Sequence, residues 1–185
     1  MILRAAAGRY TIPGSRAGLA PSGFNGRERE GMTNRVIMNR ETPSLRPEAR
    51  IGEALDSLYR HRSYSLPVVD EEGRYLGMYG VRQILARLLP KAVIIEDGLD
   101  ELGYVTDTLE QLRERLHSFR GERIGDALDH EAPAAGGDAP LLETLLHLYH
   151  GATDIPIVDP GDGALQGAIT PWEILAALTE RTAPE

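Results

Sequence analysis

The sequence contains no cysteine and few aromatic residues. Without cysteine the chain can form neither disulfides nor thiolate metal sites, a composition that fits a cytoplasmic protein. Aromatic residues make up only 5% of the 185 residues, so we expect a core built mainly from Leu, Ile, Val and Ala. No apolar run approaches the roughly 20 residues that a membrane-spanning helix needs, so we expect a soluble chain with no membrane partner.

Positive charge is also scarce, because 20 Lys and Arg face 28 Asp and Glu, which gives a net charge of −8. An acidic chain is unsuited to a nonspecific hold on a nucleic-acid backbone, so we expect no nucleic-acid partner. Residues 1–35 differ from the rest, since they are rich in Gly, Ala and Arg and lack hydrophobic periodicity. We expect a disordered tail or a true start at Met32, with a targeting peptide as a third interpretation.

An internal repeat is the most informative feature of the chain. Residues 66–89 are LPVVDEEGRYLGMYGVRQILARLL, and residues 155–178 are IPIVDPGDGALQGAITPWEILAAL. With one residue inserted in the second turn, the two segments share a Pro, an Asp, two Gly and an Ile-Leu-Ala run: Pro67/Pro156, Asp70/Asp159, Gly73/Gly163, Gly77/Gly167 and Ile84-Leu85-Ala86/Ile174-Leu175-Ala176. The match continues upstream, from Pro43/Pro133 to Tyr59/Tyr149. The chain therefore contains two copies of one structural unit.

Each copy predicts the element order β-α-β-β-α. Helical spacing predicts a first helix on Ile51, Ala54, Leu55 and Leu58, and again on Leu141, Leu145, Leu148 and Tyr149. Two extended runs around an Asp- and Gly-containing turn predict a hairpin. A second helix follows, with apolar residues Val81, Ile84, Leu85, Leu88 and Leu89 in the first copy and Ile174, Leu175 and Leu178 in the second.

One such unit cannot cover its own apolar surfaces, so we expect the two copies to pack together around a cleft. The predicted fold class is α/β (α+β), with two repeats related by a pseudo-two-fold axis. A helical insertion should separate them, with a helix on Leu109, Leu112, Leu116 and Phe119 that starts at a capping box of Asp107 and Glu110. The predicted boundaries are a tail at 1–35, repeat 1 at 36–89, the insertion at 90–131, repeat 2 at 132–180 and a tail at 181–185.

The two repeats resemble the cystathionine β-synthase (CBS) domain, whose paired form is called a Bateman module. The matching pattern is a hydrophobic-Pro-Val-Val-Asp strand, a Gly-containing turn, and a Gly-hydrophobic-hydrophobic-Thr/Ser-x-x-Asp run that enters a helix. It occurs here as LPVVDEEGRYLGMYGVRQ and IPIVDPGDGALQGAITPWE. The resemblance covers residues 42–89 and 132–178. It implies a regulatory module, often a homodimer, that binds AMP, ADP, ATP or S-adenosylmethionine.

The resemblance also implies the site residues. In repeat 2, Thr170 and Glu173 would contact ribose and phosphate, and the base would lie beside Thr153, Asp154, Ile155 and Pro156. Trp172 could stack on the base or equally fill the dimer or repeat interface. In repeat 1 the matching residues are Gly80 and Gln83, with Arg82 for added charge and Tyr64, Ser65 and Leu66 beside the base. Because Gly80 and Gln83 lack the hydroxyl and the carboxylate of the pattern, we expect the repeat 1 site to be degenerate. A helix N-terminus independently favours an anionic phosphate.

Two structural interpretations compete with these roles. Thr170 to Glu173 is also a capping box with Pro171 at the first helical position, which satisfies the helix without a ligand. His147 and His150, three residues apart and followed by Asp154, have a spacing that can hold zinc, although a solvated helix face is the simpler interpretation. We therefore expect no resident metal and no required cofactor.

Three functions remain open at this point. The first is a metabolite-sensing module that binds an adenine-type ligand and acts on an unknown regulated protein. The second is a ligand-free module for dimerisation and protein interaction. The third is a metal-dependent enzyme, for which the sequence groups no nucleophile, base and oxyanion donors, so we expect no catalysis.

Overall fold

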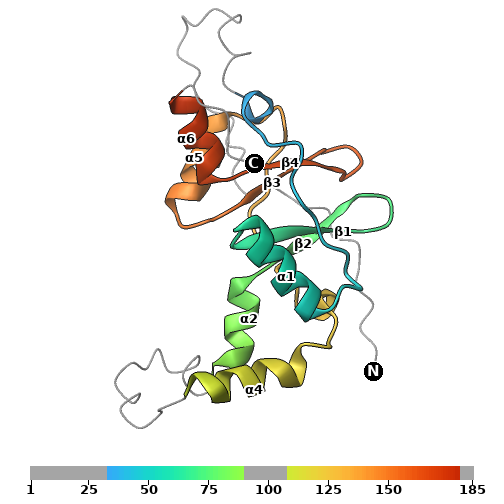
Figure 1. Ribbon diagram of the computed structural model, residues 1–185. Helices are drawn as coiled ribbons and strands as arrows, with labels where there is room; N and C mark the ends of the chain where they lie inside the picture. Colours follow the sequence, from blue (N-terminus) through green and yellow to red (C-terminus); the bar gives the residue numbers. More distant parts are fainter. Residues whose placement is uncertain (1–32, 90–107, 180–185) are drawn as a thin grey trace, which may run out of the picture.

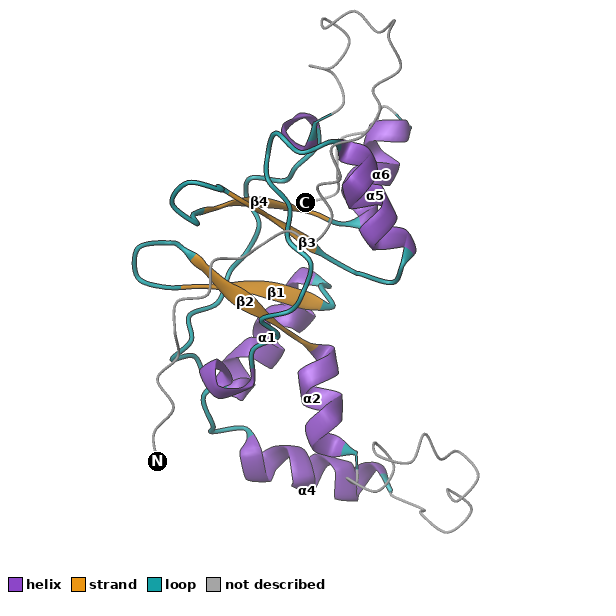
Figure 2. Cartoon of the chain, turned by 180° about the vertical axis from the view of Figure 1, so that it is seen from behind, coloured by secondary structure: helices purple, strands orange, loops and turns teal. Residues whose placement is uncertain are grey.

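The computed structural model describes residues 33–89 and 108–179, with helices on the outer sides of two hairpins (Figures 1 and 2). The predicted tail at 181–185 and Asp107 lie outside the described residues, as does nearly all of the predicted tail at 1–35. The elements in chain order are the 3₁₀ helix η1 (Asn34–Val36), α1 (Ile51–His61), β1 (Ser65–Val69), β2 (Tyr75–Gly80), α2 (Val81–Leu88), α4 (Leu109–Phe119), the 3₁₀ helix η3 (Ile124–Ala127), α5 (Leu141–Tyr149), β3 (Ile155–Val158), β4 (Leu165–Ile169) and α6 (Pro171–Leu178). The mixed helix and strand class predicted from the sequence is confirmed.

Each repeat forms an antiparallel hairpin, β1 with β2 and β3 with β4. The first turn is built by Asp70, whose carboxylate accepts the backbone N–H of Glu72 at 3.1 Å and of Arg74 at 2.8 Å. Gly73 in this turn has a φ of +82°, a backbone conformation that residues other than glycine adopt only at an energetic cost. The first extended piece of each repeat is a single parallel bridge, Leu45 to Val68 and Ala135 to Ile157.

The two hairpins meet around a pseudo-two-fold axis. At the turns, Arg74 forms a β-bridge with its repeat equivalent, Ala164. Two symmetry-related hydrogen bonds flank this bridge. One runs from the Tyr75 N–H to the Gly163 carbonyl, and the other from the Leu165 N–H to the Gly73 carbonyl. At the opposite ends, Ser65 contacts its own equivalent, Asp154. Contacts between equivalent positions at both ends give the pseudo-two-fold pair that the repeat predicts.

Each repeat also lends a segment to the sheet of the other. Asn39, near the start of repeat 1, pairs with Ala168 in β4, and Asp129, upstream of repeat 2, pairs with Met78 in β2. Glycine permits both approaches, because a Cβ at Gly167 would lie 2.3 Å from the Asn39 carbonyl oxygen. The segments 33–39 and 123–129 are thus equivalent and exchanged between the repeats, which the predicted boundaries at 36 and 132 did not anticipate.

A buried polar pair fixes the first of these exchanged segments. Asn34 is fully buried, donates through Nδ2 to the Gly136 carbonyl at 2.9 Å, and accepts the hydroxyl of buried Thr144 at 2.8 Å. Both side chains are therefore satisfied away from water. The contact joins the start of repeat 1 to helix α5 of repeat 2.

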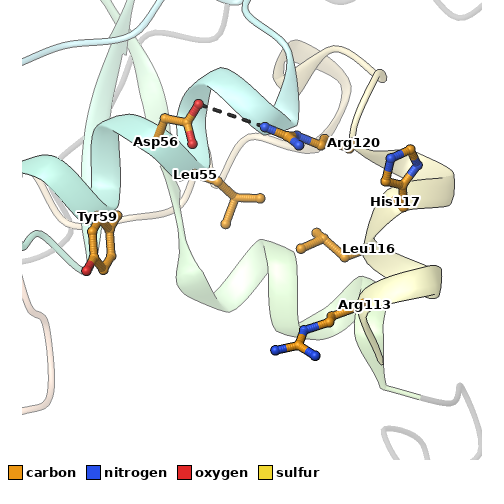
Figure 3. Close-up of a pocket in the computed structure, with 7 residues that line it drawn as sticks. All are labelled: Leu55, Asp56, Tyr59, Arg113, Leu116, His117 and Arg120. Atoms are coloured by element: carbon orange, nitrogen blue, oxygen red, sulfur yellow. Dashed lines mark ion pairs between the residues drawn. The ribbon is translucent and has the colours of Figure 1, made fainter. Parts of the chain in front are cut away.

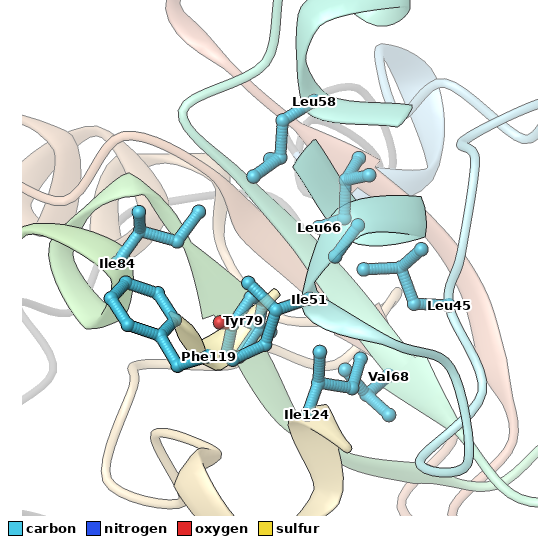
Figure 4. Close-up of a cluster of buried hydrophobic side chains, with 10 residues drawn as sticks. Leu45, Ile51, Leu58, Leu66, Val68, Tyr79, Ile84, Phe119 and Ile124 are labelled. Carbon is cyan, nitrogen blue, oxygen red and sulfur yellow. The ribbon is translucent and has the colours of Figure 1, made fainter. Parts of the chain in front are cut away.

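The core consists of two clusters, one for each repeat. The larger combines residues of the segment before α1, of α1, the β1–β2 hairpin, α2, α4 and η3 (Figure 4): Leu45, Ile51, Ala54, Leu58, Leu66, Val68, Tyr79, Ile84, Phe119 and Ile124. The second contains Met38, Ile155, Ile157 and Ile169, with Leu141, Leu148 and Ile174 packed against it. Helices α5 and α6 therefore cover the same small sheet.

Several helices bury fewer of their apolar residues than the sequence predicts. Tyr149, predicted on the buried side of α5, is 84% exposed, because Leu141 and Leu148 face the core and Tyr149 lies one residue further around the helix. Leu175 and Leu178 of α6 are likewise exposed, and of this predicted face only Ile174 packs on the core.

The other exposed residues of predicted apolar faces are Leu85 and Leu89 in repeat 1 and Leu109 of α4. The start of α4 also differs from the prediction. Its N-cap is Thr108, one residue later than predicted, with Gln111 completing the capping box. The hydroxyl of Thr108 satisfies the Gln111 N–H, so the helix begins where a side-chain acceptor is available.

Candidate functional site

The N-terminus of α6 is closed by the capping box that the sequence predicts. The Glu173 carboxylate accepts the Thr170 N–H at 2.8 Å and, with the same Oε2 atom, the Thr170 hydroxyl. The Trp172 N–H donates to Thr170 Oγ1 at 3.1 Å, and Pro171 has no N–H to satisfy. Glu173 is only 9% exposed. The capping role is thus shown, and a ligand would have to share these atoms with the cap.

The N-terminus of α2 in repeat 1 lacks a side-chain hydroxyl and has no room for one. The Gly80 N–H donates to Gln83 Oε1 at 3.0 Å, and the Val81 N–H donates to the Tyr64 carbonyl at 2.8 Å. A Cβ placed on Gly80 would lie 2.3 Å from that Tyr64 oxygen and 2.6 Å from Ser65 Cβ. The backbone at this position therefore leaves no room for a Thr or Ser side chain, and a degenerate repeat 1 site stays a prediction.

A polar contact between the repeats connects the two sets of predicted residues. The Ser65 hydroxyl donates to Asp154 Oδ2 at 2.9 Å and lies 3.5 Å from Thr153 Oγ1. Burial raises the pKa of the Asp154 carboxyl, hydrogen bonds from Thr153 and Ser65 oppose this, and the negative charge of Glu173 adds to the rise. The structure thus brings Ser65, Thr153, Asp154 and Glu173 into one region on the pseudo-two-fold axis.

The remaining predicted site residues divide by exposure. Tyr64, Trp172 and Arg82 present exposed side chains, and Arg82 makes only a loose ion pair, 3.8 Å from Asp129. The side chains of Leu66, Ile155 and Pro156 are buried in the hairpins and form part of the core. Their predicted contact with a base would have to come from the backbone, whereas the three exposed side chains are free to meet a ligand.

A groove between α1 and α4 was not predicted from the sequence (Figure 3). It has a volume of about 410 Å³ and is lined by Leu55, Asp56, Tyr59, Arg113, Leu116, His117 and Arg120. Leu55 and Leu116 form an apolar floor, and Arg120 approaches Asp56 to 3.9 Å. A sequence signal existed, since Arg113, His117 and Arg120 have helical spacing, but only the packing of α4 places them opposite α1.

Neither a metal site nor a membrane span is found within the described ranges. The structure gathers no group of three His, Cys, Asp or Glu side chains that could hold a metal in residues 33–89 and 108–179, so it does not assemble His147, His150 and Asp154 into one. In the same part of the chain, no helix has the length and apolar character needed to cross a bilayer.

Comparison with known proteins identifies the fold. Residues 35–90 match the model of the CBS domain family. No curated protein matches the chain in sequence. Among solved structures, the CBS-pair protein CBSX2 from Arabidopsis thaliana has a TM-score of 0.61 at 21% identity and covers 81% of this chain and 96% of its own. CBSX2 has also been solved in complex with AMP, with a TM-score of 0.58 at 21% identity over 81% of this chain and 98% of its own.

Two microbial proteins have the same fold. A CBS domain-containing protein of unknown function from Bacillus anthracis has a TM-score of 0.60 at 16% identity, over 84% of this chain and 99% of its own. A proposed archaeal homologue of γ-AMPK from Methanocaldococcus jannaschii has a TM-score of 0.62 at 15% identity, over 80% of this chain but only 48% of its own. Residues 35–90 thus match the CBS-domain family, and the two repeats together have the fold of these CBS-pair structures.

Proposed function

We propose that this CBS pair is a metabolite-sensing regulatory module that binds an adenine-type ligand, AMP, ADP, ATP or S-adenosylmethionine, beside the N-terminus of α6. The observation that carries the proposal is the convergence of Thr170 and Glu173 at this helix start with Asp154 and Thr153 at the axis between the repeats. A hydroxyl and two carboxylates next to a positive helix end suit ribose and phosphate together. The AMP complex of CBSX2, which has the same fold, supports the ligand class.

Glu173 gives this site a mechanism. Its carboxylate is held by Thr170, and both of these hydrogen bonds end on Oε2. A ribose that donates its hydroxyls to Glu173 would lengthen or replace them, so binding is coupled to the start of α6. Because Asp154 contacts Ser65 of the other repeat, a ligand there also bears on the relative orientation of the two repeats. A partner protein that senses this orientation would complete a regulatory, non-catalytic function.

Calorimetry of the full chain with AMP, ATP and S-adenosylmethionine tests the proposal. We expect at least one ligand to bind, and the double variant Thr170→Ala, Glu173→Ala to bind it at least tenfold more weakly, a loss of about 1.4 kcal/mol. Gln83→Ala is the matched control, since Gln83 caps the equivalent helix of repeat 1 and should leave binding unchanged. Loss of a cap costs about 1 kcal/mol, so circular dichroism must first show that each variant is folded.

The proposal fails if none of the three ligands binds at millimolar concentration, or if the double variant binds as well as the wild type. The first outcome would favour the second candidate, a ligand-free interaction module. Its specific support is that both helix starts are satisfied internally, by Glu173 in repeat 2 and by Gln83 in repeat 1. Light scattering would exclude that candidate if the chain were strictly monomeric and still bound nucleotide. A cytoplasmic location and the existence of a regulated partner protein remain predictions.

A further inference from the structure

The groove between α1 and α4 extends away from the point where the two helices touch. At that point the Gly52 N–H of α1 donates to the Arg120 carbonyl of α4 at 3.0 Å. Glycine permits this approach, because a Cβ at Gly52 would lie 2.6 Å from the Arg120 side chain. From this contact α1 runs on to Tyr59 and α4 runs back to Arg113, and both of these residues line the groove. We call this groove the α1–α4 groove.

The floor of the α1–α4 groove is apolar. Figure 3 shows Leu55 of α1 and Leu116 of α4 pointing toward one another across it. Both side chains are partly buried and pack against the larger core cluster, so the floor is the outer edge of the repeat 1 core. The atoms that line the groove are mostly carbon, and its volume of about 410 Å³ falls within the range of small-molecule sites. An apolar ligand body placed here would cover carbon that water now contacts.

Cationic side chains of α4 flank this floor. Arg120 extends toward Asp56 of α1, whose carboxylate is 3.9 Å away, so the charge of Arg120 is partly neutralised. Arg113 lies at the other end, and its ion pair is an exposed one on its own helix, with Glu110 at 3.4 Å. His117 lines the groove between the two arginines. Exposed ion pairs contribute little, so a ligand carboxylate could replace Glu110 at Arg113 at small cost.

We propose that the α1–α4 groove binds a small amphipathic anion, a molecule with an apolar body and one carboxylate. The body would lie over Leu55 and Leu116, and the carboxylate would meet Arg113. The sign of the ligand follows from the lining, which has three basic side chains and one acidic side chain, Asp56. The whole chain has a net charge of −8, so this basic surface is a local feature that favours an anion.

This site is distinct from the proposed nucleotide site. Helix α4 (Leu109–Phe119) lies between the two repeats in the sequence, so the groove is not part of the repeated unit. It shares no residue with the polar contacts at the axis or with the start of α6. Occupation of the α1–α4 groove therefore does not require a bound nucleotide, and the two sites can be tested one at a time.

Titration of the full chain with octanoate, octanol and octylamine, followed by NMR amide shifts, tests the proposal. The three probes share one apolar chain and differ in charge. We expect octanoate to bind with a millimolar dissociation constant and to shift the amides of α1 and α4. Octanol should bind about threefold more weakly, as expected for the loss of one exposed ion pair, and octylamine more weakly still. Hexanoate should bind at least fourfold more weakly than octanoate, about twofold for each half-covered methylene.

Two single substitutions should move the affinity for octanoate in opposite directions. Arg113→Gln removes the cation that meets the carboxylate and should weaken binding about threefold. Asp56→Asn removes the acidic side chain of the groove and frees Arg120, so it should tighten binding about twofold, a gain that unfolding cannot produce. Arg60→Gln is the matched control, because it removes one positive charge from an exposed position of α1 outside the groove and should leave binding unchanged.

Four outcomes would overturn the proposal: no amide shift with octanoate at about 10 mM, a concentration well above a millimolar dissociation constant; equal binding of octanoate and octanol; shifts confined to residues outside α1 and α4; or equal weakening by Arg60→Gln and Arg113→Gln. About 0.5 M salt should reduce the advantage of octanoate over octanol, since screening then acts within about 4 Å. Calorimetry of Arg113→Gln with AMP should match the wild type, which separates failure at the α1–α4 groove from failure of the nucleotide site.

Discussion

Replacement of Gly80 by Ala should destabilise the protein through a single close contact. The new Cβ would lie 2.3 Å from the Tyr64 carbonyl oxygen and 2.7 Å from Ser65 Cα, and both neighbours are backbone atoms at the start of β1. Real contacts of this kind exceed about 3.3 Å, so the backbone must move by roughly 1 Å. Overpacking costs about 1–3 kcal/mol, and we expect the upper half of this range because no flexible side chain can give way.

Urea denaturation followed by circular dichroism measures this loss. In a thermal melt, a loss of about 2–3 kcal/mol should also lower the Tm by about 5–10 °C for a chain of this size. Gly136→Ala is the control, since a Cβ at that position would have no neighbour within 4 Å, and the change should be neutral or stabilise by about 0.5 kcal/mol. If the free energy of unfolding of Gly80→Ala were within about 0.5 kcal/mol of the wild-type value, a tight backbone would not explain the missing hydroxyl of repeat 1.

The remaining predictions concern the polar contacts. Burial raises the pKa of Asp154 in the fold, so the stability linked to this group is complete at low pH and is lost as pH rises through the folded pKa. Asp154→Asn can still accept from Ser65, so it should raise the Tm at pH 7 and lose this advantage in strongly acidic buffer. An equal gain in Tm at both pH values would contradict the linkage. Asn34→Ala should cost about 1–3 kcal/mol in denaturant titrations because the buried hydroxyl of Thr144 loses its acceptor, and an unchanged midpoint would refute this. Thr170→Ala should cost about 1 kcal/mol by the same titration through loss of the α6 cap, whereas no loss would show that Glu173 alone suffices.

Local sequence signals determined the repeated unit. The apolar spacing around Ile51 and Ala54 predicted α1, since a helix buries every third or fourth residue. The Asp70 and Gly73 positions predicted the first turn, because carboxylate-to-backbone bonds and a positive φ are properties of short segments. The capping box of Thr170 and Glu173 was equally readable, since all its atoms lie within four residues.

Tertiary structure alone decided what depends on distant segments. The Ser65 to Asp154 bond and the exchange of Asn39 onto β4 join residues of different repeats, and no local pattern encodes such pairs. The sequence also could not predict how much of each helix face is buried, because an apolar stripe carries no information about which segment packs over it. Leu142 of repeat 2 is exposed for this reason, while its equivalent in repeat 1, Gly52, is covered by Arg120, although the two repeats share one pattern.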